Sequence, residues 1–340
     1  MTRFLTLLAA VLMLGACTPL MVQQAGQPPL GFQGPRLEAD RVVSFDGARL
    51  GLSTWQAKGE PWAVIVALHG MNDYANAFHL AAPIWAEQGV TTYAYDQRGF
   101  GRSPQRGVWA GDQLMIEDLR TVAALVRRKH PGAVLVVVGE SMGGSVAAEA
   151  FASDRPPTAD RLVLLSPGVW GWASQPLPNK TLLWMAANFT GPRIYTPPRW
   201  LTSKIKPTDN HEELVAMGRD PLMVWGARSD TLYGLVSLMN HAADAVDRMG
   251  GPPALYLYGG HDEIIPKRAA FRAVRGLQPD VRTAYYPDGW HLLIRDHQRQ
   301  RVIDDIAAFI RDPEAPLPSG APRIPAAPAT GGAAHVAAGL

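Results

Sequence analysis

The stretch VVVGESMGGSVAAEA, residues 136–150, decides the fold of this chain. Branched apolar residues run into a Gly-Glu-Ser-Met-Gly turn, and small residues then continue in a pattern that favours a helix. A strand, a tight turn and a helix in this order hold a serine out at the carboxyl end of the strand. Ligands bind at this end of the strands in open α/β sheets. We therefore expect Ser141 to end a buried strand and to face a cleft.

Short apolar runs that are rich in β-branched and aromatic residues recur on both sides of this stretch. They predict strands at 62–68, 90–95, 133–138, 161–165, 254–258 and 282–286. Between the second and third runs, apolar residues recur at helical spacing (Met115, Leu119, Val122, Val126). Apolar strands that alternate with helices predict an α/β fold, with a mostly parallel sheet covered by helices on both faces.

Residues 167–250 lack this alternation, and we interpret them as a cap insertion over the sheet. The folded domain then spans about residues 36–311, and 340 residues with 47% hydrophobic content suffice for one large domain. The Pro/Ala/Gly-rich residues 312–340 predict a disordered tail. The net charge is only +2 and no basic block is present, so nucleic-acid binding has no support.

The N-terminus reads as a targeting segment. The apolar run 4–14 fits a signal-peptide core, and it is shorter than the ~20 residues that a spanning helix needs. Cys17, the sole cysteine, excludes an intramolecular disulfide. Leu14-Gly15-Ala16-Cys17 resembles the lipobox of bacterial lipoproteins, although a plain secretory peptide with an incidental cysteine stays open.

The lipobox resemblance implies that residues 1–16 are a signal peptide and that Cys17 is lipidated. Residues 17–35 would then tether the domain to a membrane of the bacterial cell envelope. By resemblance to lipoprotein sorting rules, Thr18 rather than Asp after the cysteine implies the outer membrane, facing the periplasm.

An acid and a base follow later strands of the predicted sheet. A serine becomes a nucleophile when a base takes its proton and a third group orients that base. Asp262 follows the run 254–258 and His291 follows the run 282–286, so both join Ser141 at the carboxyl edge. The competing acids and histidines are Glu263, Asp230, His261 and His297. Asp96 precedes the serine in the chain, and we expect it to brace the loop that follows it.

Acyl transfer also requires backbone donors for an oxyanion. We expect one from Met142 N–H, directly after the serine, and one from Met71 N–H, in the loop HGMND after the run 62–68. No metal or organic cofactor is implied.

Taken in order, five motifs resemble the α/β-hydrolases of the monoacylglycerol lipase, lysophospholipase and serine aminopeptidase-like group. They are HGMND, YDQRGFGRSPQRG, GESMGG, GGHDEIIP and GWHLL, and the stretch 219–239 also resembles the end of the monoacylglycerol lipase cap. The resemblance implies the α/β-hydrolase fold, a triad of Ser141, Asp262 and His291, and oxyanion donors at Met71 and Met142. By analogy, cap residues line an acyl pocket, with Trp170, Trp172, Leu183, Trp184 and Met185 as candidates.

The expected activity is a serine hydrolase that cleaves monoacylglycerol-like or lysophospholipid-like esters. An aminopeptidase on the same triad stays open and would need carboxylates near the cleft to bind an amine. A thioesterase, a haloperoxidase-like enzyme and a non-catalytic envelope lipoprotein also stay open. Epoxide hydrolases and dehalogenases usually carry aspartate at the elbow, so Ser141 argues against them.

Overall fold

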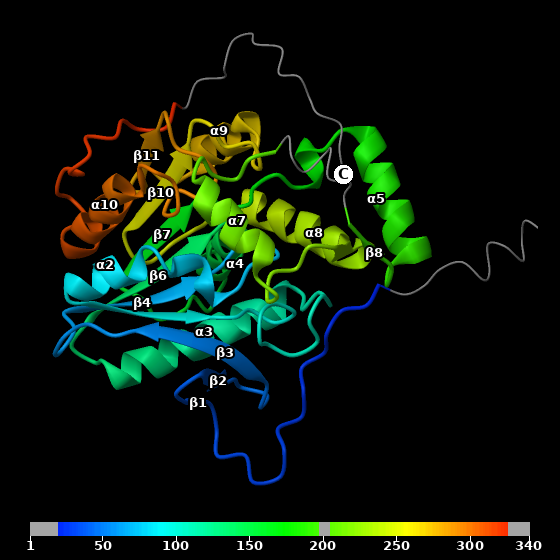
Figure 1. The fold of residues 1–340 in the computed structure, drawn as a ribbon, viewed down its shortest axis with the longest axis horizontal. Helices are drawn as coiled ribbons and strands as arrows, with labels where there is room; N and C mark the ends of the chain where they lie inside the picture. Colours follow the sequence, from blue (N-terminus) through cyan, green and yellow to red (C-terminus); the bar gives the residue numbers. More distant parts are fainter. Residues whose placement is uncertain (1–19, 197–204, 326–340) are drawn as a thin grey trace, which may run out of the picture.

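The computed structural model describes residues 20–196 and 205–325 (Figure 1). Within this part of the chain, nine strands form one sheet in the order β1-β2-β3-β5-β4-β6-β7-β10-β11. The strands are β1 (Arg36–Leu37), β2 (Arg41–Val43), β3 (Arg49–Trp55), β4 (Ala63–Leu68), β5 (Val90–Tyr95), β6 (Val134–Glu140), β7 (Arg161–Leu165), β10 (Ala254–Gly259) and β11 (Arg282–Tyr286). From β5 to β11 all neighbours are parallel, which confirms the predicted sheet.

The sequence did not predict the antiparallel edge formed by β1, β2 and β3. β2 and β3 are joined by a tight turn at Asp46-Gly47, where Gly47 adopts a φ of 84°. These strands are partly exposed and carry arginines at their ends. Their apolar signal is therefore weaker than that of the six buried central strands.

Helices cover both faces of the sheet, as predicted, because side chains alternate along each strand. Val64, Val66 and Leu68 of β4 pack in a core with α3 (Asp112–Lys129), α4 (Met142–Phe151), α8 (Ser229–Ala245) and α9 (Lys267–Gly276). Ala63, Ile65 and Ala67 face the opposite core, with η1 (Ala75–Phe78), α2 (Ala82–Glu87) and α10 (Arg299–Arg311). The carboxyl ends of the central strands stay between these layers and open toward the insertion.

The insertion is shorter than expected. It contains η2 (Trp172–Ser174), α5 (Leu177–Thr190), β8 (Ile194–Tyr195), α7 (His211–Arg219) and β9 (Ala227–Arg228), and β8 pairs with β9. Figure 1 shows α5 standing away from the sheet. The C-terminal part of the predicted cap, α8, instead belongs to the layer on the sheet, since Leu238 and Ala242 are fully buried in the core shared with α4. The last part of the expected insertion thus packs both on α4 and under α5.

Both ends of the described chain pack on the domain. Gln23 N–H donates to Trp109 O at 2.8 Å, and Gly26 N–H donates to the Asp46 carboxylate at 2.8 Å. Toward the C-terminus, Tyr285 N–H donates to Pro322 O at 2.8 Å. The expectation of disorder from residue 312 is thus wrong for residues 312–325, because backbone partners on the sheet satisfy this Pro-rich segment.

The proposed signal peptide and Cys17 lie outside the described residues. Across residues 20–196 and 205–325, no helix combines the length and hydropathy that crossing a membrane requires.

Candidate active site

Ser141 occupies a sharp turn between β6 and α4. Its φ of 53° and ψ of −116° lie in a region that residues other than glycine rarely adopt. A Cβ atom on Gly139 would lie 2.5 Å from Gly143 O, and one on Gly143 would lie 2.3 Å from Leu68 O. The turn is therefore too tight for side chains at either position. This is the physical reason for a glycine on each side of Glu140-Ser141-Met142, and the turn holds Ser141 out of the strand.

His291 and Asp262 form a buried pair beside this turn. His291 Nδ1 lies 2.8 Å from Asp262 Oδ2, and both side chains are at most 5% exposed. Asp262 Oδ1 accepts hydrogen bonds from the N–H groups of Ile264 and Ile265, each at 2.8 Å. These bonds fix the carboxylate, which in turn orients the imidazole with Nδ1 toward Asp262. The second ring nitrogen, Nε2, remains for a proton from another group.

The negative charge of Asp262 makes His291 a stronger base. Burial has the largest single effect and lowers the pKa of His291, but the charge and hydrogen bond of the Asp262 carboxylate, together with the Glu140 charge, raise this pKa above its usual value of 6.5.

Three of the four competing side chains have a partner outside this pair. Glu263 accepts from the backbone N–H of Lys206, Asp230 pairs with Arg228, and His261 stacks on Trp290. The backbone N–H of His297 donates to Asp209, and His297 does not line the cavity of Ser141. Asp96 accepts from Ala75 N–H and from Arg102, so it braces its loop as expected.

Ser141 and His291 line one cavity of about 330 Å³. Most of its wall is apolar, contributed mainly by Trp170, Leu183, Met217, Met223, Leu232, Leu235, Val236, Met239, Ile264 and Ile265. The insertion and α8 supply most of these side chains. The cavity therefore joins a polar floor at the sheet edge to an apolar roof.

Met71 and Met142, the expected oxyanion donors, both line this cavity. Met142 is the first residue of α4, and the first N–H groups of a helix have no acceptor within the helix. Next to Met71, a Cβ atom on Gly70 would lie 3.2 Å from Ser141 Cβ, so the loop after β4 runs directly against the serine.

The structure separates the five cap residues that were expected to line an acyl pocket. Trp170 and Leu183 line the cavity, whereas Trp172 and Trp184 line a shallower pocket with Lys180, Thr181 and Tyr233. Met185 lines neither pocket and is 39% exposed. On α5 the reason is helical rotation of about 100° per residue: Leu183 and Ala187 face inward, so Trp184 and Met185 turn outward. Trp172 lies on η2, where its ring packs on Tyr233 and its Nε1–H donates to Ser237 Oγ. Trp172, Trp184 and Met185 were therefore wrong choices for this cavity.

The sequence interpretation missed the wall residues of α8, although their pattern could have revealed them. Leu232, Leu235, Val236 and Met239 recur at helical spacing and face the cavity together.

It also missed a buried ion cluster at the cavity floor. The Arg295 guanidinium lies 2.8 Å from Asp73 Oδ2, 2.8 Å from Glu140 Oε2 and 3.6 Å from Glu213 Oε1. Burial raises the pKa of Glu140, and the Arg295 charge works against that rise. Because Glu140 precedes Ser141 and Asp73 lies two residues after Met71, Arg295 ties the loop after β4 to the serine turn.

Comparison with known proteins finds a matching family model and relatives that are named as lipases. A family model described as serine aminopeptidase, S33 (Hydrolase_4), matches residues 59–298. A monoacylglycerol lipase of Mycolicibacterium smegmatis is 27% identical over 282 residues, which cover 78% of this chain and 93% of that protein. The monoglyceride lipase of Rattus norvegicus is 24% identical over 266 residues, covering 77% and 86% of the two chains.

Solved structures show the same architecture. The monoacylglycerol lipase of Paleococcus ferrophilus superposes with a TM-score of 0.61 at 18% identity, covering 77% of this chain and 98% of that one. A soluble variant of the Saccharomyces cerevisiae monoglyceride lipase, solved with a substrate analog, gives a TM-score of 0.65 at 16% identity, covering 84% and 98%.

Proposed function

The chain belongs to the Hydrolase_4 family and has the α/β-hydrolase fold, and from this premise we propose that it is a serine hydrolase of carboxylic esters. The observation that carries the proposal is the buried His291–Asp262 pair, which shares an apolar cavity with the strained Ser141. A binding module has no need to combine a serine in a rare backbone conformation with an oriented histidine.

The reaction proceeds in two halves. His291 Nε2 takes the proton of Ser141 Oγ while Oγ forms a bond to the ester carbonyl carbon. The carbonyl oxygen becomes an oxyanion that accepts hydrogen bonds from the N–H groups of Met71 and Met142. His291 returns its proton to the departing alcohol oxygen as the ester C–O bond breaks. Water then attacks the acyl-serine by the same route, which releases the acid and restores Ser141.

Asp262 keeps the imidazole in the productive orientation throughout. It accepts the Nδ1–H bond and stabilises the imidazolium that forms when Nε2 is protonated.

The substrate we propose is a monoacylglycerol-like lipid ester. The apolar roof suits an acyl chain, and the relatives from M. smegmatis and rat are named as lipases of this class. A lysophospholipid would bring a phosphate that needs a cation. Among the described residues that line the cavity, Arg295 is the only lysine or arginine, and it is already paired with Asp73 and Glu140. A neutral glycerol head group therefore fits better than a phosphate.

Hydrolysis of p-nitrophenyl esters from C2 to C16 tests this function, with Ser141→Ala beside the wild type. The matched control is Ser153→Ala, two residues beyond the end of α4, whose hydroxyl donates to Ala150 O. We expect activity in the wild type and in Ser153→Ala, and its loss in Ser141→Ala. Equal inertness of all three folded proteins on every ester, including 1-monoacylglycerols, would overturn the ester proposal.

An aminopeptidase is the second candidate because two carboxylates, Asp73 and Glu140, line the cavity. Arg295 offsets one of their two negative charges, which weakens their attraction for a substrate amine. Cleavage of prolyl or alanyl p-nitroanilide faster than any ester would favour this candidate, and a preference for acyl-CoA would favour a thioesterase.

We further propose that Cys17 is lipidated and anchors the enzyme to the bacterial cell envelope. The enzyme would lie on the outer membrane and face the periplasm. The motif Leu14-Gly15-Ala16-Cys17 supports this proposal. We expect the wild type in the membrane fraction with an acylated cysteine, and Cys17→Ser in neither state. An unmodified Cys17 in the mature protein would contradict it.

A further inference from the structure

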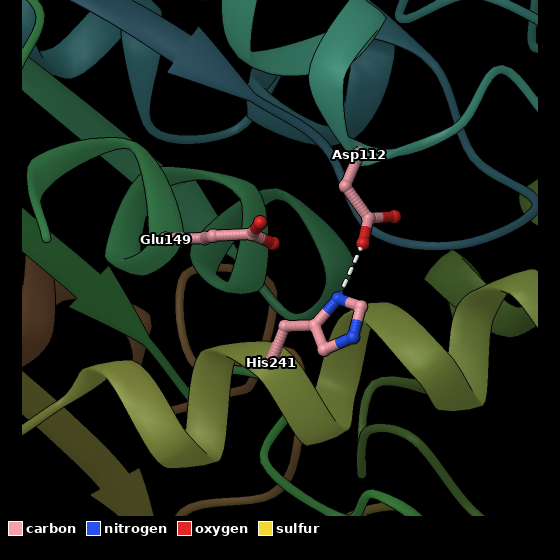
Figure 2. Close-up of side chains that lie close together, drawn as sticks. All are labelled: Asp112, Glu149 and His241. Atoms are coloured by element: carbon pink, nitrogen blue, oxygen red, sulfur yellow. Dashed lines mark hydrogen bonds and ion pairs between the residues drawn. The ribbon is translucent and has the colours of Figure 1, made fainter. Parts of the chain in front are cut away.

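Three ionisable side chains from three helices converge away from the active-site cavity. Asp112 begins α3, Glu149 lies on α4 and His241 lies on α8 (Figure 2). One oxygen or nitrogen ligand atom of each lies within 4.8 Å of those of the other two. His241 Nδ1 is 2.7 Å from Asp112 Oδ2, and Figure 2 shows the Glu149 carboxylate pointing toward this pair. None of the three lines the cavity of Ser141.

The cluster is short of positive charge. Glu149 Oε2 is buried and has no hydrogen-bond partner in the described part of the chain. Within that part, no lysine or arginine forms an ion pair with Asp112 or Glu149. Burial, and next the nearby Asp112 carboxylate, raise the pKa of Glu149 to about 7. Two carboxylates are thus held together with only one histidine as a possible counter-charge, and buried polar groups are rarely left in that state.

We propose that Asp112, Glu149 and His241 form a binding site for a divalent transition-metal cation, and that Zn²⁺ fits it best. One imidazole nitrogen and two carboxylate oxygens are a donor set that Zn²⁺ accepts, whereas Mg²⁺ and Ca²⁺ prefer oxygen ligands alone. In tetrahedral coordination at about 2.0–2.2 Å, the atoms that bind one Zn²⁺ lie about 3.3–3.6 Å from each other. The observed limit of 4.8 Å therefore requires the most separated pair of ligand atoms to approach by about 1.2–1.5 Å when the ion binds.

The surroundings supply what such a site needs. The side chain of His241 is 55% exposed, which leaves a route for the ion and room for water as a further ligand. Asp112 and Glu149 are held by α3 and α4, so the folded chain brings together residues that are far apart in sequence. The cation would therefore bind the folded state and stabilise it, while ester cleavage takes place elsewhere.

Isothermal titration of the full chain without a histidine tag, with ZnCl₂ as the probe, tests the site. The variants are Glu149→Gln and His241→Asn, and the matched control is His211→Asn, an exposed histidine at the start of α7. Glu149→Gln keeps the side-chain volume and replaces a carboxylate whose Oε2 has no partner, so it is expected to fold. Circular dichroism checks this for each variant.

We expect one equivalent of Zn²⁺ to bind the wild type and the control. Losing a ligand is expected to weaken binding by at least about tenfold in Glu149→Gln and His241→Asn. Zn²⁺ should raise the melting temperature of the wild type and the control by several degrees, and raise that of the two ligand variants much less. MgCl₂ should do neither.

Two results would overturn the proposal. One is the absence of Zn²⁺ binding to the folded wild type. The other is equal affinity in all four proteins, which would place the ion on other residues, such as His291 or Cys17.

Discussion

The carboxyl edge of the sheet and the insertion above it build the same cavity in different ways. At the edge, polar side chains are buried and held by short hydrogen bonds, as in the Asp262–His291 pair. In the insertion, the wall consists of apolar side chains such as Trp170 and Leu183, while the outer face of α5 exposes Trp184. The difference teaches that chemistry requires fixed directions, whereas the selection of an acyl chain requires mainly shape.

If this division holds, substitutions at the edge should change the rate on every ester. Substitutions in the insertion should change which ester is preferred.

The largest effect is expected from Asp262→Asn. The amide cannot hold His291 in the tautomer that the reaction needs, so kcat should fall by about 10⁴. Glu263→Gln is the matched control. Glu263 is the next residue in the chain, and among the described residues its carboxylate accepts a hydrogen bond only from the backbone N–H of Lys206. Steady-state kinetics on a short ester check both variants. A larger loss of kcat in Glu263→Gln than in Asp262→Asn would mean that Glu263, and not Asp262, is the acid that orients His291.

Arg295→Met should give the next largest effect, on stability. It leaves Asp73 and Glu140 buried without their cation, and breaking a buried ion pair in this way costs about 3–5 kcal/mol. Arg228→Met is the comparison at the end of the insertion. Its partner Asp230 lies in the first turn of α8, where the helix dipole stabilises a negative charge, so we expect a smaller loss. Urea unfolding measures both, and a larger loss for Arg228→Met would break the comparison.

Leu183→Ala should shift chain-length preference without disabling the enzyme. Removing apolar wall area should raise KM for long-chain esters by about tenfold, and C2 esters should react as in the wild type. Trp184→Ala, on the outward face of the same helix, should leave the chain-length profile unchanged. An equal change in both variants would mean that α5 acts through its stability rather than through the wall.

The smallest expected effect is a shift in the pH profile. The base must be neutral, so kcat/KM should fall as the pH drops through the pKa of His291, which lies above 6.5. The Glu140 carboxylate contributes to that raised pKa, so Glu140→Gln should move the acid limb to lower pH, by about one unit or less. Glu263→Gln should keep the wild-type limb. A shift to higher pH in Glu140→Gln would contradict the assignment of His291 as the base.

The sequence predicted those parts of the molecule whose signal is local. The central strands were visible as buried apolar runs, and Ser141, Asp262 and His291 each follow one of them. The β2–β3 hairpin was not visible, because strands with one exposed edge carry mixed residues. On α5, composition made Leu183 and Trp184 equally good candidates for the cavity wall. Only the orientation of the helix shows that Leu183 faces inward and Trp184 outward.

Contacts between distant residues escaped sequence analysis for a physical reason. Arg295 lies 155 positions from Glu140 and 222 positions from Asp73, and neither spacing follows from a strand or helix period. The same holds for Asp112 and His241, which are 129 positions apart. Such pairs are set by how the layers pack on each other, and the hydrophobic periodicity of a single sequence does not specify that packing.

Covalent labelling with a fluorophosphonate, followed by peptide mapping, tests the central claim most directly. The reagent forms a stable bond with a serine that a neighbouring base activates. We expect one adduct per folded chain, on Ser141, that is absent in Ser141→Ala and strongly reduced in Asp262→Asn. An unlabelled folded wild type, or an adduct on another residue that persists in Ser141→Ala, would contradict it.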